Sequence, residues 1–472
     1  MQNSNTAPSE VYISKGSELS PCLANLMERV GGIRNIIDNG DTVFIKFNLE
    51  LPNGFPATTN LELLKKLIEL IKDAGAEAIY LGSFPLKELT VKNIAHSLGL
   101  ESLFNSLGAK MAYLDNSNYF DKKKIDKEKL KHIIKESFVE VDVRGNKIKV
   151  PKLIIDSDKI ILVNQVNVDP LFNCRLSLTN YSFIVSNKYR KSDPSTSQEN
   201  VLYPDRIKQM YFSRILDIFS IRKPDFIIND LFYVLEGAGP FNFRDSNLKK
   251  TGILIAGRDA ISVDTITLKL LNVSEDNYDL LVEAEKRGLG TSSPSEIKTL
   301  GADIEKINLN IKKCVSSLED IQVMNLRVNS GQLCYGCFKN AYYLLNFLKT
   351  YMFKDLKYIK YNNSFFAGIN PPNVDLPEDE NILIFGDCAI KITKDKDFRK
   401  IKKKRFKKTK LRKNENILEI SGCPPDLFKT MNLLLDYYGK NKFPILNIVD
   451  LLNRLYLKGE KDKKLKIWEE VE

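Results

Sequence analysis

The chain lacks several features that would place it in a class at once. It has no apolar run long enough to cross a bilayer, and residues 1–10 have no basic start, apolar core or cleavage-like site. It also has no internal repeat, and only two histidines in 472 residues. These absences argue against a membrane protein and a repeat array, and they make the cytoplasm the expected location.

Composition and cysteine count narrow the class further. Hydrophobic residues make up 43% of the chain and aromatic residues 10%, which is typical of a globular protein of two or three domains. The seven cysteines are an odd number, and their spacing is hard to interpret as a secreted disulfide framework. A reducing compartment fits this pattern better.

Four of the cysteines lie in short turns punctuated by glycine and proline in the last third of the chain. These turns read Cys-Tyr-Gly-Cys, Gly-Asp-Cys-Ala and Gly-Cys-Pro-Pro. Thiolates held by tight backbone are what a metal centre requires, so we expect one site with four ligands: Cys334, Cys337, Cys388 and Cys423. The remaining cysteines, Cys22, Cys174 and Cys314, are interpreted as buried thiols.

The ligand spacing favours an iron-sulfur cluster, [4Fe-4S], over zinc. Structural zinc sites usually use two paired cysteine knuckles, whereas this chain has one pair and two single cysteines. An apolar helical run follows Cys337, and Pro424, Pro425 and an acid follow Cys423, so two helices are expected to begin there. Exposed N–H groups at helix N-termini would stabilise an anionic cluster. Zinc and unliganded buried cysteines remain the alternatives.

Positive charge is concentrated in one segment. The net charge is +11, but residues 391–413 alone hold fourteen Lys and Arg against two Asp, a local excess of +12. The segment is either a solvated loop or a docking surface for an acidic protein such as a small electron carrier. Nucleic acid is an unlikely partner, because Phe398 and Phe406 are the only aromatic residues available for base stacking.

The first 310 residues predict an α/β unit. Residues 61–74 have Leu and Ile at three- and four-residue spacing, and Gly75 marks the end of this expected helix. Short β-rich runs flank it, and alternating strands and helices indicate a largely parallel sheet covered by helices on both faces. The expected strands are residues 11–14, 42–47, 76–81, 109–114, 159–164, 224–230 and 251–257.

The order of these patterns suggests two domains. A polar insertion is expected at about 187–200, and a helix from about 260 to 271. The α/β pattern gives way to the cysteine-bearing region between about 305 and 330. We therefore expect an α/β domain over 1–310 and a smaller, metal-binding α/β region over 311–472.

Separated motifs over residues 10–305 resemble one known family. Gly-Asp-Thr-Val-Phe-Ile-Lys-Phe-Asn at 40–48, Ala-Thr-Thr-Asn at 57–60, Glu-Gly-Ala-Gly-Pro at 236–240 and Gly-Arg-Asp-Ala-Ile-Ser-Val-Asp at 257–264 together resemble domain-of-unknown-function family 362. Members of that family often carry a cysteine-rich iron-sulfur portion. The Gly-Cys-Pro-Pro turn is similar to the cluster-binding turn in small iron-sulfur subunits of hydrogenases and quinone reductases.

The first two motifs predict an anion site. Lys46 and Asn48 end an expected strand, and Thr58 and Thr59 lead into the next helix, where hydroxyls and free N–H groups can hold a phosphate or carboxylate. The alternative is that Thr58 to Asn60 only cap the helix and that Lys46 is an ordinary charge at a strand end.

The other two motifs supply candidate catalytic carboxylates. Glu236 is a candidate base or metal ligand, and Gly237 and Gly239 would let the backbone approach a ligand closely, although the segment can equally be a turn. Asp259 fits a helix N-cap better, so Asp264 is the stronger catalytic candidate of the two aspartates.

Two classes of function follow. The first is a redox protein in which a [4Fe-4S] cluster is coupled to an anionic ligand in the α/β domain. The second is a non-redox enzyme or binding module with a structural zinc or iron-sulfur site. The fold of family 362 resembles that of nickel-pincer lactate racemases, which implies an isomerase. That reading is weakened because such racemases use histidines, and residues 164–167 read Asn-Gln-Val-Asn where many relatives have a lysine followed closely by a histidine.

Overall fold

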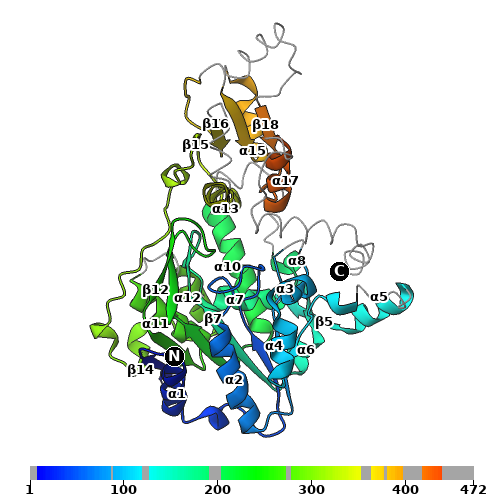
Figure 1. The fold of residues 1–472 in the computed structure, drawn as a ribbon, viewed down its shortest axis with the longest axis vertical. Helices are drawn as coiled ribbons and strands as arrows, with labels where there is room; N and C mark the ends of the chain where they lie inside the picture. The colour runs from blue at the N-terminus through cyan, green and yellow to red at the C-terminus, as the bar shows by residue number, and fades with distance from the viewer. Residues whose placement is uncertain are drawn as a thin grey trace.

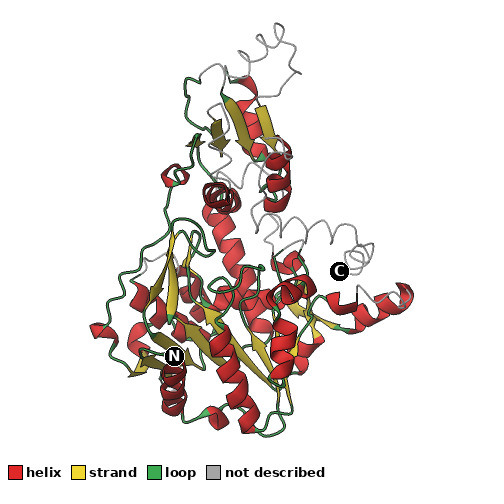
Figure 2. Ribbon diagram, viewed as in Figure 1, coloured by secondary structure: helices red, strands yellow, loops and turns green. Residues whose placement is uncertain are grey.

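The computed structural model contains two main β-sheets, a larger one that is mostly parallel and a smaller one that is parallel throughout, each flanked by helices (Figures 1 and 2). The larger sheet belongs to the first 301 residues, and the smaller one begins at Leu326. No helix within the described ranges is both long enough and apolar enough to cross a membrane. The structure describes residues 8–86, 89–119, 127–190, 204–272, 278–351, 363–376, 380–396 and 417–437.

The larger sheet has eight strands, and all neighbouring pairs are parallel except the two that involve β13. The predicted α/β fold with a largely parallel sheet is therefore confirmed. Strands at 11–14 and 76–81 were expected nearly where they occur, but the strand expected at 109–114 is only two residues long. In spatial order the strands are β14 (Ile297–Gly301), β1 (Ser9–Lys15), β13 (Ile253–Gly257), β10 (Phe226–Asp230), β7 (Lys159–Gln165), β2 (Thr42–Lys46), β3 (Ala78–Gly82) and β4 (Lys110–Met111).

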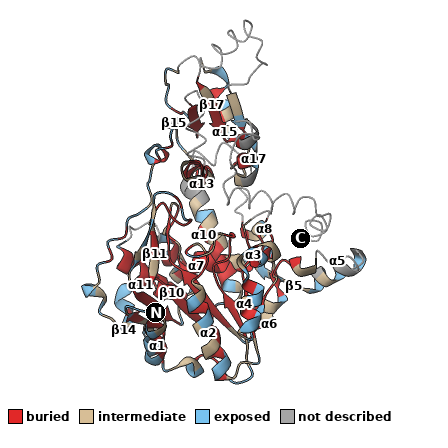
Figure 3. Ribbon diagram, in the orientation of Figure 1, coloured by how far each residue is buried: buried red, intermediate tan, exposed pale blue. Residues whose placement is uncertain are grey.

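Central strands of this sheet are apolar on both faces, as a sheet covered on two sides requires. In β7, Ile161 and Val163 face one buried apolar cluster, and Ile160 and Leu162 face another. Figure 3 shows the resulting layer of buried residues through the sheet. The first cluster packs against helices α1 (Leu19–Val30), α2 (Leu61–Ala74) and α3 (Val91–Leu98), and the second against α7 (Ser177–Tyr181), α10 (Pro204–Ile221) and α11 (Ala260–Leu271).

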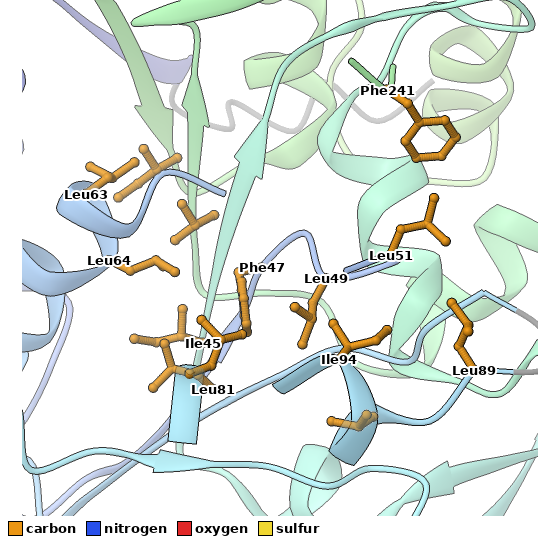
Figure 4. Packing of buried hydrophobic residues seen from close by; sticks show 14 of the residues in the cluster. Ile45, Phe47, Leu49, Leu51, Leu63, Leu64, Leu81, Leu89, Ile94 and Phe241 are labelled. Carbon is orange, nitrogen blue, oxygen red and sulfur yellow. The ribbon is translucent and has the colours of Figure 1, made fainter. Parts of the chain in front are cut away.

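Helix α2 has the bounds that its periodicity predicts. Its first turn is capped by Asn60, whose side chain accepts the Glu62 N–H, and it ends at Gly75 with a left-handed φ of 98°. Its apolar stripe, which includes Leu63 and Leu64, packs onto the sheet beside Ile45 and Leu81 (Figure 4). Propensity, capping and burial therefore agree over this segment.

The smaller sheet is parallel throughout and confirms the predicted second α/β region. Its strands, in spatial order, are β15 (Leu326–Ser330), β16 (Asn363–Ala367), β17 (Asn381–Phe385) and β18 (Ile417–Ile420). In the described part of this region the α-helices are α13 (Tyr335–Tyr351), α15 (Asp387–Ile392) and α17 (Leu427–Tyr437). Buried side chains of β16, β17 and β18 on one face pack with α13 and α17.

The other elements lie outside the two main sheets. They include three two-stranded ribbons, β5 (Phe138–Val143) with β6 (Asn146–Pro151), β8 (Val168–Asp169) with β9 (Asn173–Cys174), and β11 (Tyr233–Gly237) with β12 (Ser246–Lys250). Among the described residues, the remaining α-helices are α4 (Leu100–Ser106), α5 (Lys127–Glu136), α6 (Lys152–Asp156), α8 (Asn187–Arg190) and α12 (Tyr278–Lys286). Short 3-10 helices span Ile33–Asn35, Ser117–Tyr119, Ser182–Ile184, Pro294–Glu296, Ile304–Lys306, Leu318–Asp320 and Thr393–Asp395. Of the expected polar insertion, 187–190 form α8, and 191–200 lie outside the described residues.

Helix α7 is a fully buried turn of helix, and Asp264 of α11 holds its N-terminus. The Asp264 carboxylate accepts the N–H groups of Ser177 at 3.0 Å and Leu178 at 3.1 Å, and the Asn229 side-chain amide at 3.0 Å. Burial raises the pKa of Asp264 to about 6, although these donors oppose the rise. The carboxylate therefore satisfies the N–H groups that a buried helix start would otherwise leave unpaired.

We expect Asp264→Asn to destabilise the fold by about 1–3 kcal/mol, because its amide N–H₂ would face the Leu178 N–H, leaving buried donors without an acceptor. Urea unfolding at a pH well above the pKa of Asp264 measures this loss. Asp156→Asn is the control: its carboxylate is exposed and lies 3.9 Å from Lys152, so the change should cost no more than about 0.5 kcal/mol. Equal stability of the two variants would contradict this role for Asp264.

Candidate functional site

Polar residues gather where the central strands of the larger sheet end. Lys46 closes β2, Gln165 closes β7 and Asp230 closes β10. Because these strands are parallel, their carboxyl ends lie at one edge, which is where α/β sheets present ligand-binding groups. All three side chains are at most 1% exposed.

Lys46 is buried inside this edge and contacts protein groups. Its Nζ donates to Oδ1 of Asn180 at 2.6 Å and to the Phe47 carbonyl at 2.8 Å. Burial lowers the pKa of Lys46 well below its ordinary value; Glu50 opposes this shift, and Arg190 adds to it. Lys46 was predicted to bind an anionic ligand, with an ordinary strand-end charge as the alternative; in the structure its amine anchors the C-terminal end of α7.

Asn48 and Thr59 are also occupied by the protein's own backbone. Asn48 Oδ1 accepts the Gln165 N–H at 2.8 Å and an Asn180 amide N–H at 3.1 Å. The Asn48 N–H donates to the Thr59 hydroxyl at 2.9 Å. The side chain that caps α2 is Asn60, so Thr58 and Thr59 are not its caps.

A few buried polar atoms at this edge have no hydrogen-bond partner within the described part of the chain. They include Thr58 Oγ1, Gln165 Oε1 and Asp230 Oδ2. Gln165 and Asp230 are paired in register on neighbouring strands, and burial raises the pKa of Asp230 to about 7. The unpaired polar atoms of the described residues at this edge therefore include those of Thr58, Gln165 and Asp230. Lys46 and Asn48, which were predicted to bind a ligand, instead make hydrogen bonds within the protein.

Sequence reasoning missed an ionic cluster beside this edge. Arg175 lies between β9 and α7, and its Nη1 is 2.6 Å from Glu50 Oε2 while its Nε is 3.3 Å from Asp169 Oδ2. Its guanidinium lies over the ring of Phe241, 5.4 Å from the centroid. One signal for Glu50 was present: it continues the alternation of Lys46 and Asn48 past the end of β2.

The Glu-Gly-Ala-Gly-Pro segment packs against other parts of the chain. Glu236 accepts the Asn247 side-chain amide at 3.0 Å and the Lys312 N–H at 2.9 Å, so its carboxylate ties three segments together. A Cβ on Gly239 would lie 2.3 Å from the Val168 carbonyl oxygen, and one on Gly237, at φ 83°, would lie 2.4 Å from that of Asp245. The glycines permit close approach of the protein's own backbone, whereas the sequence predicted close approach to a ligand.

The two aspartates of the last motif have different structural roles. Asp259 is the N-cap of α11, where its side chain accepts the Ile261 N–H, as the sequence favoured. Its Oδ2 also accepts the Thr291 N–H at 2.8 Å. Asp264, the candidate catalytic residue, is the anchor of α7 described above and does not reach Glu236 through any hydrogen bond of the described residues.

The smaller sheet brings the four predicted cysteine ligands to its carboxyl edge. Cys334 and Cys337 follow β15, Cys388 follows β17, and Cys423 follows β18. The first two are buried and the other two are half-buried. Parallel pairing of the strands places their following loops together.

Hydrogen bonds that involve backbone groups connect these loops to one another and to α13. The Asp387 N–H donates to the Gly422 carbonyl, and the Gly422 N–H donates to Asp387 Oδ1 at 2.8 Å. Asn340 of α13 donates to the Pro425 carbonyl at 2.7 Å. A Cβ on Gly386 would lie 3.4 Å from Cys337 Sγ, so the Gly-Asp-Cys turn passes close to that thiol.

The four thiols influence one another's ionisation. A hydrogen bond from the Cys337 thiol, together with backbone N–H groups at the start of α13, lowers the pKa of Cys334 to about 6. Burial and the negative charge of Cys334 and Cys388 raise the pKa of Cys423 to about 11. Within the described ranges, no three Cys, His, Asp or Glu side chains form a ready group for a single metal ion.

The burial of Lys46 predicts how stability depends on pH. Between its lowered folded-state pKa and its ordinary value of 10.5, the unfolded chain binds more protons than the folded chain, so this residue makes the unfolding free energy rise with pH. We expect Lys46→Met to lose that rise. Urea unfolding between about pH 7 and 10 tests this, with Lys152→Met, an exposed lysine, as the control. Parallel pH profiles of the parent and the Lys46→Met variant would contradict it.

Comparisons with known proteins support one family. The structure of lactate racemase apoprotein from Thermoanaerobacterium thermosaccharolyticum matches with a TM-score of 0.34 and 11% identity, over 77% of this chain and 70% of that chain. That similarity is too low to support an inference about function. None of the curated proteins matches the chain. Residues 43–269, which contain the anion-site, Glu-Gly-Ala-Gly-Pro and Asp259–Asp264 motifs, match the family described as "Domain of unknown function (DUF362)".

Proposed function

We propose that this protein is a redox-active iron-sulfur protein, whose [4Fe-4S] cluster is held by Cys334, Cys337, Cys388 and Cys423 and is coupled to an anionic ligand in the α/β unit. One observation carries the proposal: three loops that follow three parallel strands bring four cysteines to a single edge.

The chemistry of the donor set fits such a group. Four thiolates are the usual ligands of a [4Fe-4S] cluster, and N–H groups near the sulfurs offset their negative charge. Here the N–H groups of Gly336 and Cys337 favour the Cys334 thiolate. When bound, the cluster would supply one-electron transfer, while the protein would hold its ligands and limit access of water.

Buried positive charge supports the anionic ligand. Two guanidinium groups lie near the carboxyl edge of β2: Arg190 is buried and Arg175 is mostly buried, and the Arg190 guanidinium lies 3.8 Å from the centroid of the Phe183 ring. Glu50 and Asp169 are ion-paired with Arg175. A carboxylate or phosphate would meet these two guanidinium groups and the Thr58 hydroxyl, which has no partner among the described residues.

The alternative is a non-redox enzyme or binding module in which the cysteines hold a structural zinc ion. It shares the same ligands, so metal analysis of the purified protein separates the two.

Protein purified without oxygen should be brown, with visible absorption that bleaches with dithionite and with iron and sulfide in equal amounts, about four of each per chain. Cys423→Ser should lose most of this iron and colour while the α/β unit stays folded, because that unit has its own apolar core. Cys22→Ser is the matched control: the Cys22 thiol lies 3.4 Å from Ser14 Oγ in the α/β unit, far along the chain from the cluster ligands.

The control variant should keep the iron content of the parent. Colourless parent protein with one zinc per chain would replace the redox proposal by the structural-zinc alternative. Equal iron in the parent and Cys423→Ser would remove Cys423 from the ligand set.

The basic segment gives a separate prediction about the partner. Residues 397–413 lie outside the described residues, so the prediction rests on charge alone. Replacing Lys402, Lys403, Lys404, Lys407 and Lys408 by Gln should slow electron transfer from an acidic carrier protein mainly at low salt, because salt screens the steering of exposed charges.

Stopped-flow reduction over a range of salt concentrations measures this effect. A matched variant replaces five exposed lysines of the α/β unit by Gln: Lys15, Lys65, Lys72, Lys110 and Lys152. If both variants slow electron transfer by the same factor at low salt, the rate depends on total charge and the segment is not a docking surface.

A further inference from the structure

The β8–β9 ribbon and its tip, residues 168–174, lie between the two candidate sites. The tip contacts the cysteine-bearing helix: Tyr335 is the residue after Cys334, and its hydroxyl donates to the Leu171 carbonyl at 2.6 Å. The Tyr335 ring also meets Phe172 edge to face, with centroids 6.3 Å apart. Phe172 in turn stacks with Tyr211 and Phe212 of α10, so the tip is wedged between α10 and α13.

Asp169 holds this tip and connects it to the ionic cluster. Its Oδ1 accepts the N–H groups of Leu171 at 2.8 Å and Phe172 at 3.1 Å. Its Oδ2 accepts from Nε of Arg175, whose Nη1 reaches Glu50 just after β2. Asp169 is only 4% exposed, so these bonds are shielded from water, and removing one partner would leave a buried polar or charged group uncompensated.

A continuous series of bonds therefore runs from the cysteine turn to the carboxyl edge of β2, through Tyr335, Leu171, Asp169, Arg175 and Glu50. The base of the ribbon packs closely against Gly239, since a Cβ at that position would lie 2.3 Å from the Val168 carbonyl oxygen. A displacement at either end would have to be shared by the bonded groups between them.

We propose that Asp169 is a positioning residue for the proposed cluster. Among the described residues it makes no hydrogen bond to the four predicted ligands; through the tip of the ribbon and Tyr335 it fixes the start of α13, and with it the N–H groups that face the Cys334 sulfur. Hydrogen bonds to cluster sulfurs and solvent exposure set reduction potentials, so the orientation of this turn should set the potential. The expected change in reduction potential rests on the proposed function. The expected effect of Asp169 on the start of α13 rests on the hydrogen bonds alone.

Two variants break the series at different points. Asp169→Asn keeps an oxygen for the Leu171 and Phe172 N–H groups, but its amide would face the Nε–H of Arg175. Tyr335→Phe keeps the ring against Phe172 and removes the bond to Leu171. Tyr181→Phe is the matched control, because Tyr181 also donates its hydroxyl to a backbone carbonyl, that of Arg222, but in the α/β core.

The midpoint potential of the full-length holoprotein, titrated with dithionite and mediator dyes, tests the proposal. Asp169→Asn and Tyr335→Phe should each change the equilibrium constant for one-electron reduction by about threefold or more, and Tyr181→Phe should not. The double variant should shift no further than the larger single shift, because both changes break one series. A parent-like potential in Asp169→Asn, or additive shifts in the double variant, would overturn the proposal.

Hydrogen exchange gives a second readout that needs no cluster. In the same variants, prepared as apoprotein, the N–H groups of residues 335–339 should exchange faster in Asp169→Asn and Tyr335→Phe than in the parent or Tyr181→Phe. If the purified parent protein proves to contain no cluster but these variants exchange faster, the redox function is wrong and the positioning role of Asp169 still holds. Unchanged exchange would overturn the positioning role even if the cluster is present.

Discussion

Parallel strand pairing is the constraint on which both candidate sites depend. Each parallel strand must be reached through a crossover, so the loops that follow the strands collect at one edge of a sheet. In the larger sheet this rule brings together the ends of β2, β7 and β10, and in the smaller sheet it brings together the cysteine loops after β15, β17 and β18. The cysteines are far apart in sequence, and only this topology makes them neighbours.

Burial decides what the polar residues at the larger edge do. Lys46, Asn48 and Asp264 all make hydrogen bonds to α7 or its neighbours, because a buried helix must have its polar groups satisfied. Side chains that look like ligand-binding groups in the sequence are therefore used to hold an internal helix. Thr58 and Asp230 are also buried, yet each keeps one side-chain oxygen without a hydrogen-bond partner among the described residues.

Local patterns predicted the elements well and the contacts poorly. The bounds of α2 followed from its Leu and Ile spacing and from Gly75, and the N-cap role of Asp259 followed from its place before an apolar run. The strand expected at 109–114 is only two residues long and pairs with β3 at the edge of the sheet. Arg175, Asp169 and Glu50 form an ion-paired group across 125 positions of sequence, and no local pattern reveals such a partner.

Aromatic side chains pack across the contact between the two units, so the chain cannot be divided there without exposing them. Phe241 and Phe243 of the α/β unit pack edge to face on Tyr343 and Phe347 of α13, at centroid distances of 5.2 and 5.1 Å. These residues belong to one apolar cluster that extends from α1 and α2 into the smaller sheet. An α/β unit cut away after β14 would expose those rings to water and invite self-association. The two units thus share one apolar core. A fusion of either unit to another protein would need new apolar side chains to bury these rings.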